Sequence, residues 1–151
     1  MIQNKKRFLV HLLVVVFVVS VISIIFQKSE ATGGSWKVVG SAGFSTGEAD
    51  FTSLAVNSKG VPYMAFTHDS DSRATVMKFN GTKWENVGNA KFSVGEVDFT
   101  SLAFDSKDTP YIAFEDFANN YKATVMKFNG TKWVNVGTAG FSASDAYYTS
   151  L

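Results

Sequence analysis

The chain has 151 residues and a formal net charge of +1, and it contains no cysteine. Without cysteine it can form no disulfide framework, no thiolate metal site and no cysteine nucleophile. Residues 1–31 hold four basic residues and one acidic residue, so the remainder has a net charge of −2. It has no run of lysine or arginine, which excludes the electrostatic footprint of a nucleic-acid-binding protein.

The amino terminus predicts export. Three basic residues at 5–7 precede an apolar run from Phe8 to Phe26, which is long for a signal peptide and just long enough to span a bilayer as a hydrophobic helix. The letters "SEA" at 29–31 then offer small residues where a signal peptidase reads. Residues 1–31 are therefore predicted to be a cleaved signal peptide or an uncleaved membrane anchor, with the rest of the chain secreted or extracytoplasmic.

The rest of the sequence repeats itself. The letters "ATVMKFNGTKW" occur at 74–84 and again at 123–133, and "FTSLAVNSKGVPYMAF" at 51–66 is echoed by "FTSLAFDSKDTPYIAF" at 99–114. Trp36, Trp84 and Trp133 are spaced by 48 and 49 residues, and "YTSL" at 148–151 begins a third copy. A fixed period of this length is typical of solenoids and propellers.

Each repeat reads as four short strands. The first, 51–56, alternates between small residues on one face and the larger Leu54 and Val56 on the other. Asn80-Gly81 predicts a two-residue type I′ hairpin between the third strand and the fourth. The expected strands of the first complete repeat are 51–56, 62–66, 74–80 and 83–88.

Four-stranded antiparallel units in tandem predict an all-β fold of β-propeller blades over residues 35–151, because neighbours must cover the faces of each unit. Complete blades are expected at about 51–88 and 99–137, with 35–40 as the last strand of a preceding blade and 148–151 as the first strand of the next. Since a propeller closes with about four to eight blades, we expect an incomplete ring and a fragment of a longer repeat protein. The alternatives are a short chain that closes its ring as a homo-oligomer and an open stack of blades with exposed terminal edges.

The segment "TSLAVNSKGVPYMAF…ATVMKFNGTKWENVG" resembles the blades of exported bacterial β-propellers, in the neighbourhood of kelch-like and sialidase-like repeats. The resemblance covers nearly everything after Ser35. The Gly-Gly doublet of kelch repeats, the Trp-Asp dipeptide of WD40 repeats and the Asp-box of sialidases are not matched. The resemblance therefore implies a scaffold on a secreted or surface-attached polypeptide, and no particular chemistry.

The two ends of such a unit differ in their connections. The turns "NSKG" and "NGTK" are short and share one end, whereas the variable loops 67–73 and 115–122 and the connections between repeats gather at the other. Function concentrates on loops that a rigid scaffold holds. This second end is the predicted ligand-binding face, with the residues Glu48, Asp50, His68, Asp69, Asp71, Arg73, Glu96, Asp98, Glu115, Asp116, Phe117, Asn119, Asn120 and Tyr121.

No catalytic residue and no metal ligand is predicted on this face. The pairs Glu48-x-Asp50 and Glu96-x-Asp98 could coordinate calcium or carry acid–base chemistry, but acidic residues also cap turns before strands. His68 is expected to be an exposed loop residue, because no histidine stands at its position in the next repeat. Calcium is the single cofactor to which the sequence points, and its signal is weak.

The pattern as a whole predicts an exported or cell-surface β-propeller module that binds a protein or glycan ligand without catalysis. It is expected to contact no nucleic acid and to meet the membrane only through its amino-terminal segment. The alternative is part of a secreted propeller that binds or cleaves glycans, as sialidase-like proteins do. The repeated tryptophans are expected to pack within or between blades, with sugar stacking as the other interpretation.

Overall fold

The structure is a computed structural model that describes residues 34–68 and 70–151. The predicted signal peptide or anchor and the candidate residue Asp69 lie outside the described residues. Over the two described ranges, no helix is long and apolar enough to cross a membrane. All strands belong to the compact unit Val38–Leu151.

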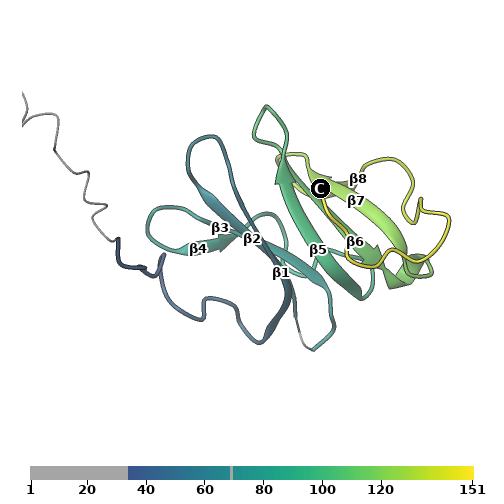
Figure 1. Ribbon diagram of the computed structural model, residues 1–151, viewed down its shortest axis with the longest axis horizontal. Coiled ribbons are helices and arrows are strands. Elements are labelled where there is room, and N and C mark those ends of the chain that lie inside the picture. The colour runs from purple at the N-terminus through teal and green to yellow at the C-terminus, as the bar shows by residue number, and fades with distance from the viewer. Residues whose placement is uncertain (1–33, 69) are drawn as a thin grey trace, which may run out of the picture. The chain divides into compact units, whose positions relative to one another are not determined.

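The fold is all-β and consists of two four-stranded antiparallel sheets of the same topology (Figure 1). Sheet 1 contains β1 (Ala49–Val56), β2 (Pro62–His68), β3 (Ala74–Phe79) and β4 (Trp84–Asn86). Sheet 2 contains β5 (Val97–Phe104), β6 (Pro110–Asp116), β7 (Lys122–Phe128) and β8 (Trp133–Asn135), with a 3-10 helix, η1 (Phe117–Asn119), between β6 and β7. Within each sheet the strands lie in chain order. The predicted all-β class with two four-stranded antiparallel units is confirmed.

The β3–β4 turn is built by an asparagine side chain. Asn80 Oδ1 accepts hydrogen bonds from the N–H groups of Thr82 and Lys83, each over 3.0 Å, and the Asn80 N–H donates to the Lys83 carbonyl. Gly81, with φ of 97°, is the one residue of this loop in the left-handed region. The predicted two-residue type I′ turn is therefore wrong, because the Asn80 side chain supplies the acceptor of a longer, four-residue loop.

β1 turns its small residues inward and its large residues outward. Ser53 and Ala55 are half-buried, whereas Leu54 and Val56 are 59% and 56% exposed. Leu102 is the counterpart of Leu54 in β5, and it is only 6% exposed because sheet 1 covers this face of sheet 2. The large-residue face of a sheet is thus the face that packs against the preceding repeat.

Apolar residues of both repeats form one core between the sheets. Val76 and Val87 of the first repeat pack with Val97, Ile112 and Trp133 of the second. A four-stranded meander leaves both of its faces in water when it stands alone, so stacking two of them removes apolar surface that neither could bury by itself.

The letters Thr-Ser-Leu join one repeat to the next. The Thr100 hydroxyl donates a hydrogen bond to the Phe51 carbonyl, and the Leu102 N–H donates to Ser53 Oγ over 2.9 Å. Phe51 has a φ of 46° at a register shift between β1 and β2, which leaves its carbonyl outside the β1–β2 ladder. These letters therefore specify contact between repeats, and we call this contact the seam.

The third copy makes the same seam contacts on sheet 2. The Thr149 hydroxyl donates to the Phe99 carbonyl, and the Leu151 N–H donates to Ser101 Oγ over 3.0 Å. Residues 148–151 nevertheless form no strand, and neither do residues 35–40, in contrast to what the sequence pattern predicted for both segments. A strand needs a ladder of backbone hydrogen bonds with a neighbour, and the contacts of 148–151 on β5 run through side-chain hydroxyls instead.

Replacing Thr100 by valine is expected to lower the free energy of unfolding by about 1–3 kcal/mol, because the Phe51 carbonyl loses its donor while the shape of the side chain is kept. Thr52→Val is the matched control, since Thr52 has the same place in the first repeat and is exposed. Urea denaturation of the two variants measures the difference. Equal losses in both would show that the seam hydrogen bond adds nothing to stability.

Candidate functional site

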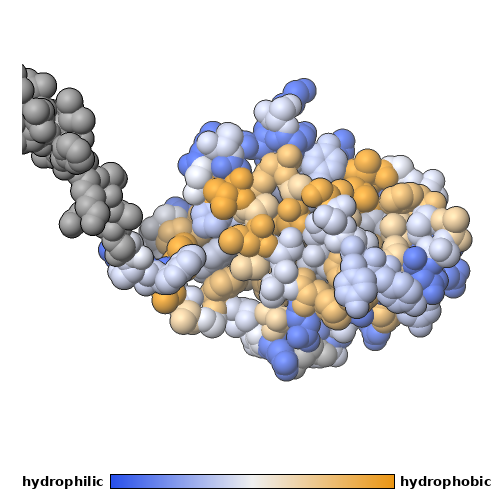
Figure 2. All heavy atoms as spheres, viewed as in Figure 1, coloured by the Kyte–Doolittle hydropathy of each residue, from blue (hydrophilic) through white to orange (hydrophobic). Residues whose placement is uncertain are grey.

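The two ends of the sheets carry opposite charge. The loop end, where β1 and β3 begin and β2 ends, has a net charge of −5 among the described residues, from Glu48, Asp50, Asp71, Glu96, Asp98, Glu115, Asp116 and Asp145 with Arg73, Lys91 and Lys122. The turn end, which holds the β1–β2 and β3–β4 turns and their counterparts, has a net charge of +3, from Lys59, Lys78, Lys83, Lys107, Lys127 and Lys132 with Glu85, Asp105 and Asp108. Figure 2 shows hydrophilic residues at both extremities and hydrophobic residues between them. Clustered charge of one sign attracts ligands of the other.

Three of the predicted loop residues are buried strand residues instead. His68 is the last residue of β2 and pairs with Ala49, and Glu115 and Asp116 end β6, where Asp116 pairs with Lys122. His68 is 5% exposed, Glu115 2% and Asp116 6%. The prediction of an exposed loop histidine is wrong, because the strand pairing continues beyond the last apolar residue of each repeat.

The Asp116 carboxylate is used inside the protein. Its Oδ2 accepts hydrogen bonds from the Thr124 hydroxyl over 2.8 Å and from Asn119 Nδ2 over 2.9 Å. The following residues reverse the chain through η1 and through Asn120 and Tyr121, which both have positive φ. Asp116 and Asn119 therefore hold this loop in place, and a buried carboxylate with two donors is satisfied without a ligand.

Arg73 and Asp71 also contact the protein itself. The Arg73 guanidinium donates to the Ser93 carbonyl, and Asp71 Oδ2 lies 3.1 Å from Lys91 Nζ. Desolvation raises the pKa of Asp71, but the hydrogen bond and charge of Lys91 and the contribution of Arg73 outweigh it, so the pKa lies below 3.8. These two residues tie the β2–β3 loop to the connection between the repeats.

Glu115 and Asp98 are the carboxyl groups in the least favourable surroundings. Glu115 Oε1 is buried and has no hydrogen-bond partner among the described residues. Desolvation and the charges of Asp98 and Asp145 raise the pKa of Glu115 above 4.5, and desolvation with the charges of Glu96 and Asp50 raises the pKa of Asp98 above 3.8. An added positive charge at this place would favour the ionised form of both groups.

Glu115→Gln is expected to raise the free energy of unfolding at about pH 7 by on the order of 1 kcal/mol, because it removes an ionised and unpartnered buried group. A raised carboxyl pKa means that the folded protein binds the proton more tightly, so stability falls as the pH rises from 4.5 through the raised pKa. The free energy of unfolding of the variant should therefore equal that of the parent at pH values below this window and exceed it at pH values above. Urea denaturation across the pH range measures this, with the exposed Glu48→Gln as control, and an unchanged pH profile would contradict it.

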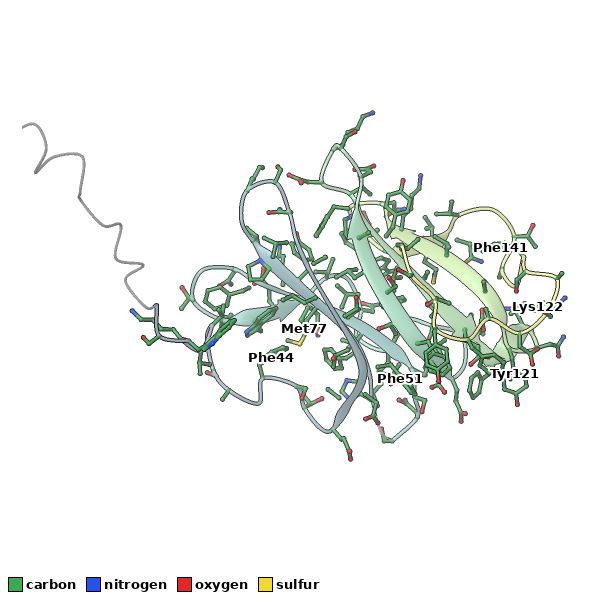
Figure 3. The ribbon with its side chains drawn as sticks, in the orientation of Figure 1. Phe44, Phe51, Met77, Tyr121, Lys122 and Phe141 are labelled. Carbon is green, nitrogen blue, oxygen red and sulfur yellow. The ribbon has the colours of Figure 1, made fainter. Side chains whose placement is uncertain are left out.

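The exposed part of the loop end combines carboxylates with aromatic rings. Glu48, Asp50 and Glu96 are exposed. Phe117 and Tyr121 place their ring centroids 4.6 Å apart, and Tyr121 is 49% exposed. Figure 3 shows Tyr121 at the same extremity of the molecule as Phe51.

A second aromatic group runs across the repeats at this end. The rings of Phe51 and Phe99 lie 5.0 Å apart and those of Phe99 and Tyr148 lie 4.7 Å apart. All three residues have positive φ, which is uncommon for aromatic residues, and for Phe51 and Phe99 it accompanies the register shifts of β1 and β5. Tyr148 is 82% exposed.

Within residues 34–68 and 70–151, no group of three or more histidine or carboxylate side chains is placed to hold a metal ion. Calcium binding through Glu48, Asp50, Glu96 and Asp98 stays a prediction. The same spacing occurs at the starts of β1 and β5, and it also fits the other interpretation, in which these acidic residues cap turns before a strand.

The sequence patterns do not predict one hollow of the described protein. It has a volume of about 690 Å³ and lies at the turn end, lined by residues of both repeats. Its signal in the sequence is the lysine that recurs in the third strand of each repeat, at 78 and 127. A single repeat could not reveal a cavity whose walls come from two sheets.

No protein-family model matches the chain, and no curated protein and no solved structure shows significant similarity to it.

Proposed function

We propose that the chain is an exported or surface-displayed β-propeller-type repeat module that binds a basic segment of a partner protein through its loop end, without catalysis. The observation that carries the proposal is the crowding of carboxyl groups around Asp98 and Glu115, because desolvation and the charges of neighbouring carboxylates raise the pKa of both. A lysine or arginine side chain brought to this place would relieve the repulsion. The rings of Phe51 and Phe99 lie at the same end, and an aromatic face that a cation can reach adds cation–π contacts for the same kind of ligand.

The propeller arrangement is supported by the way the two sheets meet. β1 and β5 are the first strands of their sheets, and they contact each other along the seam (Figure 1). In a propeller the first strands of successive blades lie side by side around the axis, and the loops between the second and third strands gather on one face. Asp50 and Asp98 lie near the starts of β1 and β5. In a propeller they would therefore belong to neighbouring blades and lie on the same face.

Binding of hexalysine to the full chain tests the proposal by isothermal titration calorimetry at low salt. The variant Asp98→Asn with Asp50→Asn is expected to weaken binding about tenfold, because it removes two carboxylates from the face. Glu85→Gln, which removes a carboxylate at the turn end, is the matched control and should leave the affinity unchanged. Equal losses in both variants, or no binding by the parent chain, would overturn the proposal.

A glycan-binding or glycan-cleaving propeller is the second candidate, and the Phe117–Tyr121 ring pair favours it. Tyr121 is half-exposed and packs on Phe117, so an aromatic face is accessible to a sugar ring. A glycan array probed with the full chain and with Tyr121→Ala separates the two candidates. Specific sugar binding that the variant loses would favour this one, and a hydrolytic activity that Asp98→Asn abolishes would contradict the non-catalytic role.

A further inference from the structure

The chain contains the same hairpin turn twice. The letters "NGTKW" occur at 80–84 and at 129–133, and both turns are exposed from the asparagine to the lysine. In each turn, the asparagine Oδ1 accepts hydrogen bonds from the N–H groups of the two residues that follow the glycine, over 2.9 to 3.0 Å. Gly81 and Gly130 have φ of 97° and 95°. The two turns therefore have the same hydrogen bonds and nearly the same glycine conformation.

One side-chain contact distinguishes the two turns. Asn80 Nδ2 donates a hydrogen bond to Glu85 Oε2 over 2.9 Å, and Glu85 Oε1 lies 3.5 Å from Lys78 Nζ. Val134 stands at the place of Glu85 in the second repeat. In the described part of the chain, Asn129 Nδ2 accordingly has no hydrogen-bond acceptor, although Asn129 Oδ1 is bonded like that of Asn80. The amide nitrogen is thus held in the first turn and free in the second.

An asparagine that precedes glycine can lose its side-chain amide without an enzyme. The glycine N–H gives up its proton, its nitrogen attacks the asparagine Cγ, and the bond from Cγ to Nδ2 breaks as ammonia leaves. The succinimide ring that forms takes up one water molecule and opens to aspartate or to isoaspartate. Glycine permits this ring closure because it has no side chain to obstruct it, and a Cβ atom on Gly81 or Gly130 would meet nothing within 4 Å.

We propose that Asn129 is a site of spontaneous deamidation and that Glu85 protects Asn80, its counterpart in the first repeat. A carboxylate beside the amide opposes the negative charge that builds up as the glycine nitrogen attacks. The hydrogen bond from Asn80 is the main cause that lowers the pKa of Glu85 below 4.5. Glu85 is therefore ionised at neutral pH and has no proton to give to the leaving nitrogen. Val134 has neither effect on Asn129.

The two products are expected to affect the turn differently. Aspartate should leave it intact, because the chain already uses aspartate in this way: Asp105 Oδ1 accepts from the N–H groups of Lys107 and Thr109 over 2.9 and 2.8 Å. Isoaspartate adds a methylene group to the backbone and moves the acceptor away from the two N–H groups of the β7–β8 turn. Either product adds one negative charge to the turn end.

Incubation of the full chain at mildly alkaline pH, followed by mass spectrometry, tests the proposal. Chemical cleavage after Met77 and Met126 separates the two turns, whereas trypsin would release the same peptide, "FNGTK", from both. Asn129 is expected to lose its amide about fivefold faster than Asn80, which is the scale of a like-charge interaction across a few ångströms of water.

Reciprocal exchange of the distinguishing residue provides the matched variants. Glu85→Val should raise the deamidation rate of Asn80 to that of Asn129, and Val134→Glu should lower the rate of Asn129 to that of Asn80. In concentrated urea the two asparagines of the parent should react at the same rate, because the contact with Glu85 is lost. Thermal unfolding of each variant shows whether it is folded.

Three results would overturn the proposal. These are equal rates at the two asparagines in the folded parent, a difference that persists in urea, and unchanged rates in both exchange variants. Each readout is a chemical change at the turn end and is independent of hexalysine binding at the loop end. Failure of this proposal is therefore distinguishable from failure of the proposed function.

Discussion

Replacing Trp133 by alanine is expected to lower the free energy of unfolding by about 3–5 kcal/mol, which is the usual cost of removing a buried tryptophan. Trp133 is 6% exposed and stacks on Phe92 with ring centroids 4.7 Å apart. Its indole N–H donates to the Val87 carbonyl over 2.8 Å. The side chain thus anchors the last strand of sheet 2 to the connection that leaves sheet 1, and its loss opens a cavity in the seam.

Two further variants identify the origin of this effect. Trp36→Ala changes the same repeat position where the side chain is fully exposed, and stability should change by no more than about 0.5 kcal/mol. Trp133→Phe keeps the stacked ring but removes the N–H donor, and a loss of about 1–3 kcal/mol is expected from the unpaired Val87 carbonyl. Chemical denaturation measures all three. Similar losses for Trp36→Ala and Trp133→Ala would contradict a seam role for this tryptophan.

The second large effect is expected for Gly88→Ala. Gly88 has a φ of 76°, and a Cβ atom at this position would lie 2.9 Å from Cε2 of Phe128, inside the contact that sheet 2 makes with the preceding connection. The left-handed conformation alone costs an alanine about 1–2 kcal/mol. Displacing the packed Phe128 ring adds about 1–3 kcal/mol, as overpacking does in other cores.

The chain contains a matched control for this glycine. Gly137 has the same place in the following repeat and nearly the same φ, 75°, but a Cβ atom there meets nothing within 4 Å. Gly137→Ala should therefore show the conformational cost alone. The difference between the stability losses of the two variants, measured by thermal or urea unfolding, gives the cost of disturbing the contact with Phe128. No difference would mean that the Phe128 ring moves aside freely.

Much of the scaffold could be predicted because it depends on local patterns. The alternation of β1 and the proline that begins β2 are confirmed. Packing is confirmed for two of the three repeated tryptophans, since Trp84 and Trp133 donate to the carbonyls of Val39 and Val87, whereas Trp36 is fully exposed. The function of the repeated letters in the seam was harder to foresee. The threonine recurs at 52, 100 and 149, but the letters alone do not show that the Thr100 hydroxyl bonds to a carbonyl 49 residues away in the preceding repeat.

The site could be predicted only in part, because burial at strand ends is decided by pairing. His68, Glu115 and Asp116 look like loop residues in a polar stretch, yet the ladders with β1, β5 and β7 continue through them. The raised pKa of Glu115 depends on its burial and on Asp98 and Asp145, which lie outside β6 and far from Glu115 in the sequence. The turn-end cavity likewise needs walls from two sheets, and no local pattern encodes the space between them.

Hydrogen exchange measured by NMR tests the seam between the repeats most directly. The Leu102 amide, bonded to Ser53 Oγ, and the Trp133 indole N–H, bonded to the Val87 carbonyl, are predicted to exchange slowly, whereas the exposed Trp36 indole exchanges rapidly. The β6 amide of Ile112 reports on sheet 2 itself. Rapid exchange at Leu102 and Trp133 together with a protected Ile112 would contradict the seam, because it would show two folded sheets that are not joined.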